Sequence, residues 1–245
     1  MAENIATIAW NATQRDEIKN VLQSKEFDLL VIGGGITGAG VAREAQIYGL
    51  KCALVDKNDF AFGTSSRSTK MAHGGIRYLK NLELGLVKES VTERNWMRVH
   101  FPNLVRPVPF AFCAPFSIGS TFMLKLGVYL YDHLSDSGQK FKNYKKHQLF
   151  MNKADWNEIE PGLIKDGLIG GGIYYDNNVD DARLTLEVIK EAVARGATAL
   201  NYAKVVDYST NDQGKIVAAK AEDAVAGDVF EIRAKVFINA TGIWT

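Results

Sequence analysis

A short apolar run that ends in a glycine cluster is the feature that most restricts how this chain can fold. Residues 27–32, "FDLLVI", have the composition of a strand buried on both faces. The next segment, "ITGAGVAREAQIY", has helical spacing and stops at Gly49, a residue type that commonly ends helices. A second apolar run at residues 52–56, "CALVD", completes a strand–helix–strand unit, which predicts two parallel strands joined by a right-handed crossover.

The glycines after the first run follow the spacing G-x-G-x-x-G through Gly33, Gly35 and Gly38. Glycines at these positions allow a tight turn, a close approach of the backbone to a pyrophosphate, and close packing of the helix on the strand. The start of the helix also presents free N–H groups to phosphates. Asp56 ends the second run, where a carboxylate can accept both hydroxyls of an adenosine ribose. This context predicts a dinucleotide site, with an ordinary tight turn as the alternative.

The loop after Asp56 is dense in hydroxyl groups, glycines and cations over residues 62–79, "FGTSSRSTKMAHGGIRYL". Its hydroxyls can donate to phosphate or flavin oxygens, and Gly74 and Gly75 would let the backbone lie close to a flat ring. Arg77 can clamp an anionic substrate group with two hydrogen bonds. A polar surface loop with a structural arginine is the alternative. The hydroxyl-bearing residues in question are Thr64, Ser65, Ser66 and Ser68.

The rest of the chain predicts further pieces of an α/β fold. Residues 83–100 have helical spacing, and a second helix begins at Asp181 or a neighbour and ends at Gly196. Residues 203–239 read as an antiparallel meander. Its last piece, residues 235–239, is apolar on both faces, so we expect it to return to the parallel sheet.

Composition excludes some classes of function. The net charge of +1 gives no overall basic field, so nucleic acid is not an expected partner, and the basic cluster at residues 140–147 is interpreted as a solvated face. Cys52 and Cys113 lie far apart and have no metal-ligand spacing, so we expect two small buried side chains and no metal site. The first twenty residues lack a basic region followed by an apolar core, so no signal peptide is expected.

One uncharged stretch, residues 107–124, is long enough to raise the question of a membrane span. Pro109 and Pro115 argue against a continuous spanning helix. Two interpretations remain: a buried loop and helix of the core, or an apolar face that sits on a membrane surface.

Four segments together resemble the flavin-dependent glycerol-3-phosphate dehydrogenases, a branch of the D-amino-acid-oxidase-like flavoproteins. The resemblance runs from about Phe27 to Thr245, is most specific over residues 63–79, and is nearest to Gram-positive bacterial enzymes, some of which are oxidases. The segments that carry it are "VIGGGITGAG", "DFAFGTSSRSTKMAHGGIRYL", "VDDARL" and "INATG".

The resemblance implies a reaction and its partners. FAD binds without a covalent link, and glycerol 3-phosphate loses a hydride from C2 to flavin N5 while a base takes the proton of the C2 hydroxyl. The product is dihydroxyacetone phosphate, and the electrons pass to quinone, or to O2 in the oxidases. The implied enzyme is a homo-oligomer in its full-length form and is cytoplasmic or peripheral on the inner face of the cell membrane.

The resemblance also implies a fold: a Rossmann-like FAD-binding domain with a parallel sheet and an antiparallel β-meander, plus part of a mixed α+β substrate lobe. We expect a helical lead-in at residues 1–26, the first part of the FAD-binding domain at 27–105, a partial lobe facing substrate or membrane at 106–178, and the second part of the FAD-binding domain at 179–245.

The resemblance assigns site residues one by one. Arg77 matches a substrate-binding arginine. His73 is a tentative general base, with a neutral packing histidine as the alternative, so the base stays unassigned. The positions matched to cofactor contacts are Gly33, Gly35, Ile36, Thr37, Gly38, Asp56, Lys57, Thr64, Ser65, Ser66, Ser68, Met71, Ala72, His73, Gly74, Val205, Thr241 and Gly242.

The last eight residues, "INATGIWT", place a small-residue turn where the family usually reads "NATGPW" and continues. Ile243 stands where proline is usual, and the C-terminal half of the family fold is absent. We therefore expect an N-terminal piece of the enzyme, with weak FAD binding and no turnover by itself. Three alternatives remain: an amine or amino-acid oxidase of the same group, a nicotinamide dehydrogenase, and a non-catalytic flavin-binding fragment that needs a partner chain.

Overall fold

The computed structural model describes residues 10–115, 118–136, 140–150, 153–162 and 168–244. The chain divides into two compact units. The first unit comprises Met1–Thr69 and Asp181–Thr245, and the second comprises Lys70–Asp180.

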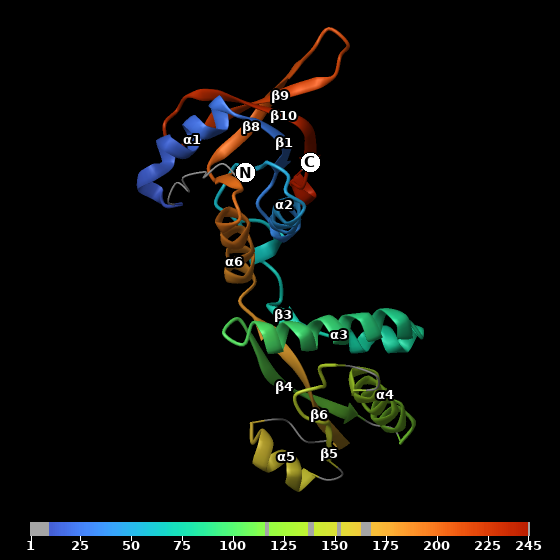
Figure 1. The fold of residues 1–245 in the computed structure, drawn as a ribbon. Coiled ribbons are helices and arrows are strands. Elements are labelled where there is room, and N and C mark those ends of the chain that lie inside the picture. The colour runs from blue at the N-terminus through green and yellow to red at the C-terminus, as the bar shows by residue number, and fades with distance from the viewer. Residues whose placement is uncertain (1–9, 116–117, 137–139, 151–152, 163–167, 245) are drawn as a thin grey trace. The chain divides into compact units, whose positions relative to one another are not determined.

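The first unit is built on a six-stranded sheet with the strand order β7-β2-β1-β10-β9-β8. Its strands β1, β8, β9 and β10 are labelled in Figure 1. The strands β7, β2, β1 and β10 are parallel neighbours, and β10, β9 and β8 form an antiparallel meander. Phe237 of β10 lies opposite Leu30 of β1, which confirms that the end of the meander returns to the parallel sheet. The bounds are β1 (Glu26–Ile32), β2 (Cys52–Val55), β7 (Thr198–Leu200), β8 (Ala203–Thr210), β9 (Ile216–Asp223) and β10 (Val229–Asn239).

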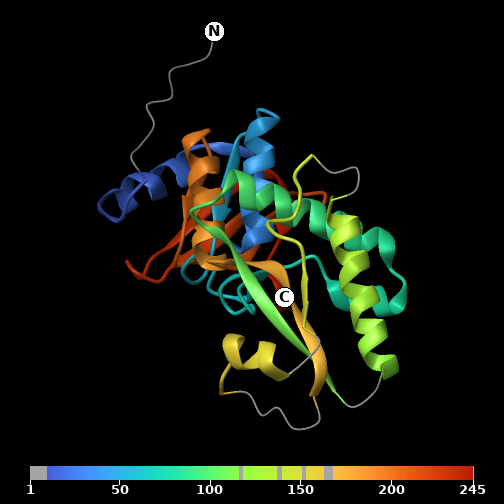
Figure 2. The same cartoon turned by 90° about the horizontal axis from the view of Figure 1, so that it is seen from below.

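Helices cover both faces of this sheet, as the predicted α/β fold class requires. The helices α2 (Ile36–Ile47) and α6 (Asp181–Ala194) lie side by side (Figures 1 and 2) and pack on the face that carries Leu29 and Val31. Helix α1 (Arg15–Ser24) packs on the other face, where Leu30 is buried. Successive residues of a strand point to opposite faces, and both faces are covered here, so β1 is apolar from Leu29 to Ile32.

Helix α1 is part of this unit rather than a separate lead-in. Ile18 and Leu22 are buried in the core of the sheet. Asp223, at the end of β9, binds Nη2 of Arg15 at 2.7 Å and Nζ of Lys19 at 3.4 Å. The apolar side of the helix and this buried carboxylate therefore fix α1 on the sheet together.

The ion pair at Asp223 should make the free energy of unfolding decrease at acidic pH. Burial by itself raises the pKa of Asp223, but hydrogen bonds from Arg15 and from the N–H groups of Val225 and Ala226 outweigh burial and hold it at about 2, against an ordinary value of 3.8. A depressed pKa stabilises the folded state above the unfolded pKa, and this contribution is lost as the pH falls from about 4 to about 2. We expect the loss to be about 2 kcal/mol in unfolding free energy.

Urea unfolding at a series of pH values would test this expectation. The variant Asp223→Asn should be less stable than the wild type at neutral pH, and the difference should shrink as the pH falls from about 4 to about 2. A difference that stays constant over this range would contradict the assignment.

The second unit contains a four-stranded antiparallel sheet centred on β6. Strand β4 pairs along one side of β6, where Figure 2 shows the two running together, and β3 and β5 pair along the other. The strands are β3 (Met71–Ala72), β4 (Val105–Pro115), β5 (Gln148–Phe150) and β6 (Leu168–Val179), and the helices are α3 (Leu84–His100), α4 (Ile118–Asp136) and α5 (Lys153–Ile159). Four short 3₁₀ helices complete the described chain: η1 (Ala12–Gln14), η2 (Thr64–Ser66), η3 (Ile76–Asn81) and η4 (Gly242–Trp244).

The first part of the uncharged stretch at residues 107–124 is the edge strand β4. A buried loop was one of the two interpretations of this stretch from the sequence, and the structure has a strand there instead. Pro107 and Pro109 lie opposite Asn177 and Tyr175 of β6. They are two residues apart, so their backbone nitrogens point to the same side of β4. An edge strand tolerates proline because its outer side has no ladder hydrogen bonds to lose. The second part of the stretch enters α4. Within the described ranges, we find no helix with the length and apolar character needed to cross a bilayer.

The boundary between the units falls at 69/70, earlier than the expected 105/106, and the second boundary falls at 180/181 rather than 178/179. The physical reason is that residues 70–105 pair and pack with the rest of the second unit. Met71 and Ala72 pair with Asn178 and Asn177 of β6, and α3 packs on α4 and on β4.

Candidate functional site

The glycine turn lies at the carboxyl end of β1, between β2 and β10. Gly33 has a φ of +113° and passes so close to Ala240 that a side chain at position 33 would overlap the carbonyl oxygen of Ala240. The N–H of Ala240 donates to the carbonyl oxygen of Ile32 at 2.8 Å. The turn and the "INATG" segment, which are distant in the sequence, therefore lie against each other. In open α/β sheets, ligands bind at such a switch point between neighbouring strands.

The third glycine of the motif brings α2 against the turn. A side chain at Gly38 would overlap the carbonyl oxygen of Gly33, so only glycine lets the helix start this close to the strand. At the first turn of α2, the N–H of Ile36 donates to Oγ of Ser65 at 2.9 Å. The positive end of the helix, which includes Thr37, opens at this edge of the sheet.

Asp56 links the end of β2 to the glycine turn. Its carboxylate accepts hydrogen bonds from the N–H groups of Gly34 at 2.7 Å and Asn58 at 2.8 Å. Burial raises the pKa of Asp56, and these two hydrogen bonds partly offset that effect. Each carboxylate oxygen can accept a further bond, so the group can still accept ribose hydroxyls.

The start of β8 adjoins the same strand end. The N–H of Ala203 donates to the carbonyl oxygen of Asp56 at 2.8 Å. Val205, two residues further on, is half-buried against the core, and the pairing of β8 with β9 shifts register between Val205 and Asp207. Bulges of this kind change the direction of nearby side chains and are frequent beside functional sites.

The hydroxyls after Asp56 are engaged within the first unit. Ser65 accepts from α2, as described above, and Oγ of Ser66 donates to the carbonyl oxygen of Phe62 at 3.3 Å. Oγ of Ser68 donates to Oδ2 of Asp181 at 2.6 Å, at the start of α6. Thr64 is exposed. In this structure Ser68 therefore joins the loop to α6, a contact that the sequence pattern did not indicate.

The turn after β10 lies against the loop that follows Asp56, where Trp244 is next to Gly63. Oγ1 of Thr241 donates to Oδ1 of Asn239 at 2.6 Å, and Gly242 has a φ of +64°. Nζ of Lys57 lies 5.1 Å from the centre of the Trp244 ring, a cation–π distance. Trp244 was not among the predicted site residues, although a tryptophan next to the small-residue turn was a usable signal.

The remaining predicted residues belong to the second unit. His73 and Arg77 are exposed, and Gly75 has a φ of +69°. The N–H of Gly75 donates to Nδ1 of His73 at 3.0 Å. Since Nδ1 accepts this bond, the proton of the neutral ring lies on Nε2, which is then a donor. The residues before the turn, Met71 and Ala72, form β3.

Three buried polar residues near this turn escaped the sequence analysis. Arg94, Tyr131 and Asp176 bind one another, and Tyr131 and Asp176 accept a hydrogen bond from the N–H of Gly74. The usable signal was Arg94 itself, because it is three residues after Val91 and shares the apolar side of a predicted helix.

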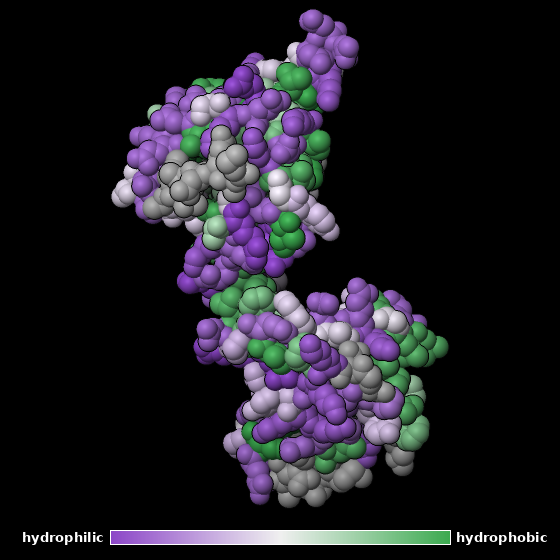
Figure 3. Space-filling model, viewed as in Figure 1, coloured by the Kyte–Doolittle hydropathy of each residue, from purple (hydrophilic) through white to green (hydrophobic). Residues whose placement is uncertain are grey.

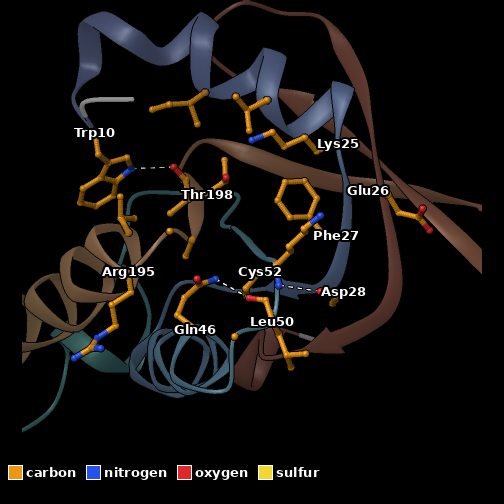
Figure 4. Close-up of a pocket in the computed structure, with 18 of the residues that line it drawn as sticks. Trp10, Lys25, Glu26, Phe27, Asp28, Gln46, Leu50, Cys52, Arg195 and Thr198 are labelled. Atoms are coloured by element: carbon orange, nitrogen blue, oxygen red, sulfur yellow. Dashed lines mark hydrogen bonds between the residues drawn. The ribbon is translucent and has the colours of Figure 1, made fainter. Parts of the chain in front are cut away.

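A separate cavity of about 700 Å³ lies at the opposite edge of the first unit's sheet, where β1, β2 and β7 begin (Figure 4). Trp10 lies at its border and donates from Nε1 to the carbonyl oxygen of Ala199 at 2.9 Å. The ends of α2 and α6 border it through Gln46 and Arg195. Helix C-termini disfavour phosphates, and none of the predicted cofactor residues lines this cavity. No cluster of metal-ligating side chains was found in the described part of the chain.

Comparison with known proteins identifies relatives across nearly the whole chain. The aerobic glycerol-3-phosphate dehydrogenase of Staphylococcus haemolyticus is 41% identical over 240 residues, which are 97% of this chain and 42% of the relative. The alpha-glycerophosphate oxidase of Enterococcus casseliflavus is 40% identical over 239 residues, 95% of this chain and 38% of the relative. This chain thus spans well under half the length of these relatives.

A solved structure agrees with these matches. The X-ray structure of the glycerol-3-phosphate dehydrogenase from Bacillus halodurans, complexed with FAD, superposes with a TM-score of 0.67 at 38% identity and covers 94% of this chain and 37% of that one. The model of the FAD dependent oxidoreductase family matches residues 28–245, which confirms the resemblance drawn from the sequence motifs. This chain belongs to the FAD dependent oxidoreductase (DAO) family.

Proposed function

We propose that this chain binds FAD and takes part in the oxidation of sn-glycerol 3-phosphate to dihydroxyacetone phosphate. The observation that carries the proposal is the superposition on an FAD-complexed glycerol-3-phosphate dehydrogenase over 94% of the chain. The reaction removes a hydride from C2 and the proton of the C2 hydroxyl. Bound FAD would supply the hydride acceptor.

The residues of the first unit fit a dinucleotide. Side chains are sterically excluded at Gly33 and Gly38, the two positions that make the tight turn and let the helix pack on the strand in a dinucleotide-binding motif. The positive end of α2 opens at the same edge, and Asp56 keeps free acceptor capacity for a ribose. We assign the adenosine and pyrophosphate side of FAD to this unit, with Lys57, Val205, Thr241 and Gly242 at its margin.

The residues of the second unit are assigned to the reacting side. The exposed guanidinium of Arg77 would bind the substrate phosphate. His73 donates from Nε2, because Nδ1 is occupied by the N–H of Gly75. To take the proton of the C2 hydroxyl, His73 would have to give up this bond and change tautomer. We therefore propose His73 as a hydrogen-bond donor rather than the general base.

Two electron acceptors are compatible with the relatives. The Staphylococcus relative is named an aerobic dehydrogenase and the Enterococcus relative an oxidase. We propose quinone as the acceptor, with O2 as the alternative, in a homo-oligomer of the cytoplasm or the inner face of the cell membrane. Oxygen consumption with and without added quinone would separate the two acceptors.

A fluorescence titration of FAD into the purified chain, with the visible spectrum recorded after gel filtration, tests cofactor binding. We expect quenched flavin fluorescence and a protein-bound flavin spectrum. Substrate is then added, and a change in the flavin spectrum reports its binding even if the flavin is not reduced. A protein that never binds FAD would refute the proposal for this chain.

The variant Arg77→Ala should weaken this response to glycerol 3-phosphate by about 10- to 100-fold in Kd, because a charged clamp on the phosphate is removed. FAD affinity should stay unchanged. Lys80→Ala is the matched control, because it removes the same charge from the same 3₁₀ helix, η3. Equal effects of the two variants would mean that only the general positive charge matters.

We also propose that residues 107–130, of which 116 and 117 lie outside the described residues, are at a membrane surface. Phe122 and Met123 of α4 are 64% and 65% exposed, and Leu126 and Tyr129 continue the apolar face. Figure 3 shows hydrophobic residues gathered over α4. The exposed lysines of the 140–147 segment follow directly, and His147 binds Asp132 of α4 at 2.7 Å. Apolar and basic groups together suit an anionic bilayer.

Vesicle flotation tests this surface. The chain should float with vesicles that contain anionic lipid, and Leu126→Glu should reduce the bound fraction several-fold, since a charge in the bilayer interface is unfavourable. Val225→Glu, at an exposed apolar residue of the first unit, is the control and should float like the wild type. A wild-type chain that stays at the bottom of the gradient would eliminate the membrane proposal.

A further inference from the structure

A buried polar centre joins α3, α4 and β6 within the second unit. Arg94 and Asp176 are each 2% exposed, and Tyr131 is fully buried. Nη1 of Arg94 lies 2.7 Å from Oδ1 of Asp176 and 3.0 Å from the hydroxyl of Tyr131. The Tyr131 hydroxyl donates to Oδ1 of Asp176 at 2.7 Å. The guanidinium also donates to Oγ of Ser135 at 2.8 Å, so its charge is well compensated.

This centre also binds a backbone group of the loop after β3, the N–H of Gly74. That N–H donates to the Tyr131 hydroxyl at 2.8 Å and to Oδ1 of Asp176 at 3.1 Å. Strand β3 ends at Ala72, so Gly74 lies beyond the pairing of the sheet. A side chain at position 74 would overlap the Tyr131 hydroxyl and Val91, so the glycine is packed directly on this centre.

The Tyr131 hydroxyl uses its full hydrogen-bonding capacity. It accepts from Gly74 and Arg94 and donates to Asp176. Burial is the main reason that the pKa of Tyr131 is raised, so the hydroxyl stays protonated and keeps its direction. The next N–H along the chain, that of Gly75, fixes the ring of His73. The two consecutive amides thus connect the buried centre to the residue that the turn presents.

We propose that Tyr131 is a positioning residue, which, held by Arg94 and Asp176, sets the turn of residues 73–75 in the geometry required beside the flavin. The inference rests on the proposed FAD function for its consequence, but the contact with Gly74 does not depend on it. Tyr131 touches neither cofactor nor substrate in this scheme; it acts through the backbone of Gly74.

Amide hydrogen exchange tests the contact without any cofactor. In the wild type the Gly74 amide should exchange at least about tenfold more slowly than in Tyr131→Phe, which keeps the ring and removes the hydroxyl. Tyr174→Phe is the matched control, because the ring of Tyr174 meets that of Tyr131 edge to face, with ring centres 5.9 Å apart. The N–H of Gly74 donates to Tyr131 and not to Tyr174, so exchange at Gly74 should be unchanged in this variant.

Visible circular dichroism of bound flavin supplies the second readout, which a general loss of stability would not move. At saturating FAD, Tyr131→Phe should change the flavin signal and Tyr174→Phe should not. Faster exchange together with a changed signal supports the proposal, and faster exchange with an unchanged signal overturns the link to the flavin. Equal exchange in wild type and Tyr131→Phe overturns the proposal entirely.

If the wild type binds no FAD, the proposed function fails and the flavin link falls with it, while exchange still decides whether Tyr131 holds the turn. If Tyr131→Phe does not fold, the wild type alone decides. A Gly74 amide that exchanges as fast as an unstructured glycine would overturn the contact, and strong protection beyond the end of β3 would support it.

Discussion

The variant Gly38→Ala should bind FAD about 10- to 100-fold more weakly than the wild type. The new methyl group would overlap the carbonyl oxygen of Gly33, which is backbone and cannot rotate away. The start of α2 would have to move off the turn, and overpacking of this kind costs about 1–3 kcal/mol. A loss of about 1.4 kcal/mol in binding free energy weakens affinity about tenfold, and a loss of about 2.8 kcal/mol weakens it about 100-fold. Fluorescence titration of FAD measures the effect.

Gly40→Ala provides the matched control on the same helix. A methyl group at position 40 meets nothing within 4 Å, so it should leave FAD affinity unchanged. Alanine in a helix interior should also raise stability, by up to about 1 kcal/mol. If Gly38→Ala binds FAD as well as Gly40→Ala does, the close packing of α2 on the turn is irrelevant to binding and the dinucleotide assignment loses its steric basis.

The variant Arg94→Met should lower the free energy of unfolding by about 3–5 kcal/mol. It leaves the carboxylate of Asp176, 2% exposed, without its cationic partner in the protein interior. It also removes the donors to Tyr131 and Ser135. Urea unfolding followed by far-ultraviolet circular dichroism measures the loss.

Two comparisons make this expectation specific. Arg195→Met removes an exposed partner of Glu191, at 2.9 Å on α6, and should cost less than about 1 kcal/mol. The double variant Arg94→Met, Asp176→Leu removes both buried charges and should be more stable than Arg94→Met alone. Equal losses for Arg94→Met and Arg195→Met would show that the buried charge has no special cost.

The parts of the fold that the sequence predicts are those in which local pattern and tertiary structure agree. The run at 27–32, the helix after it and the run at 52–56 became β1, α2 and β2, because continuous apolar strands and a glycine turn leave few other arrangements. Gly196 ends α6 in a φ of +114°, as its position after the helix suggested. The glycine contacts at Gly33 and Gly38 agree with the roles inferred from spacing.

The second unit was harder to predict because its decisive contacts are long-range. Residues 107–115 contain three prolines and show no alternation, so nothing local indicates a strand; β4 exists because β6 offers a continuous partner. The role of Arg94 could not be inferred without Asp176, which lies far along the chain on another element. The hydrogen bond from Ser68 to Asp181 likewise joins residues that are far apart in the sequence, so no local pattern indicates it.

The placement of β10 beside β1 also bears on the order of events during synthesis. Residues 26–32 leave the ribosome well before their partners, residues 233–239, which lie about 200 residues further along the chain. Until then one side of β1 has no neighbouring strand, and the glycine turn lacks the contact from Ala240. Pairing over such a separation is slow to form. The nascent protein therefore contains the glycine turn long before β10 and Ala240 are available to pack against it. In that interval the unpaired edge of β1 is prone to pair with the wrong strand.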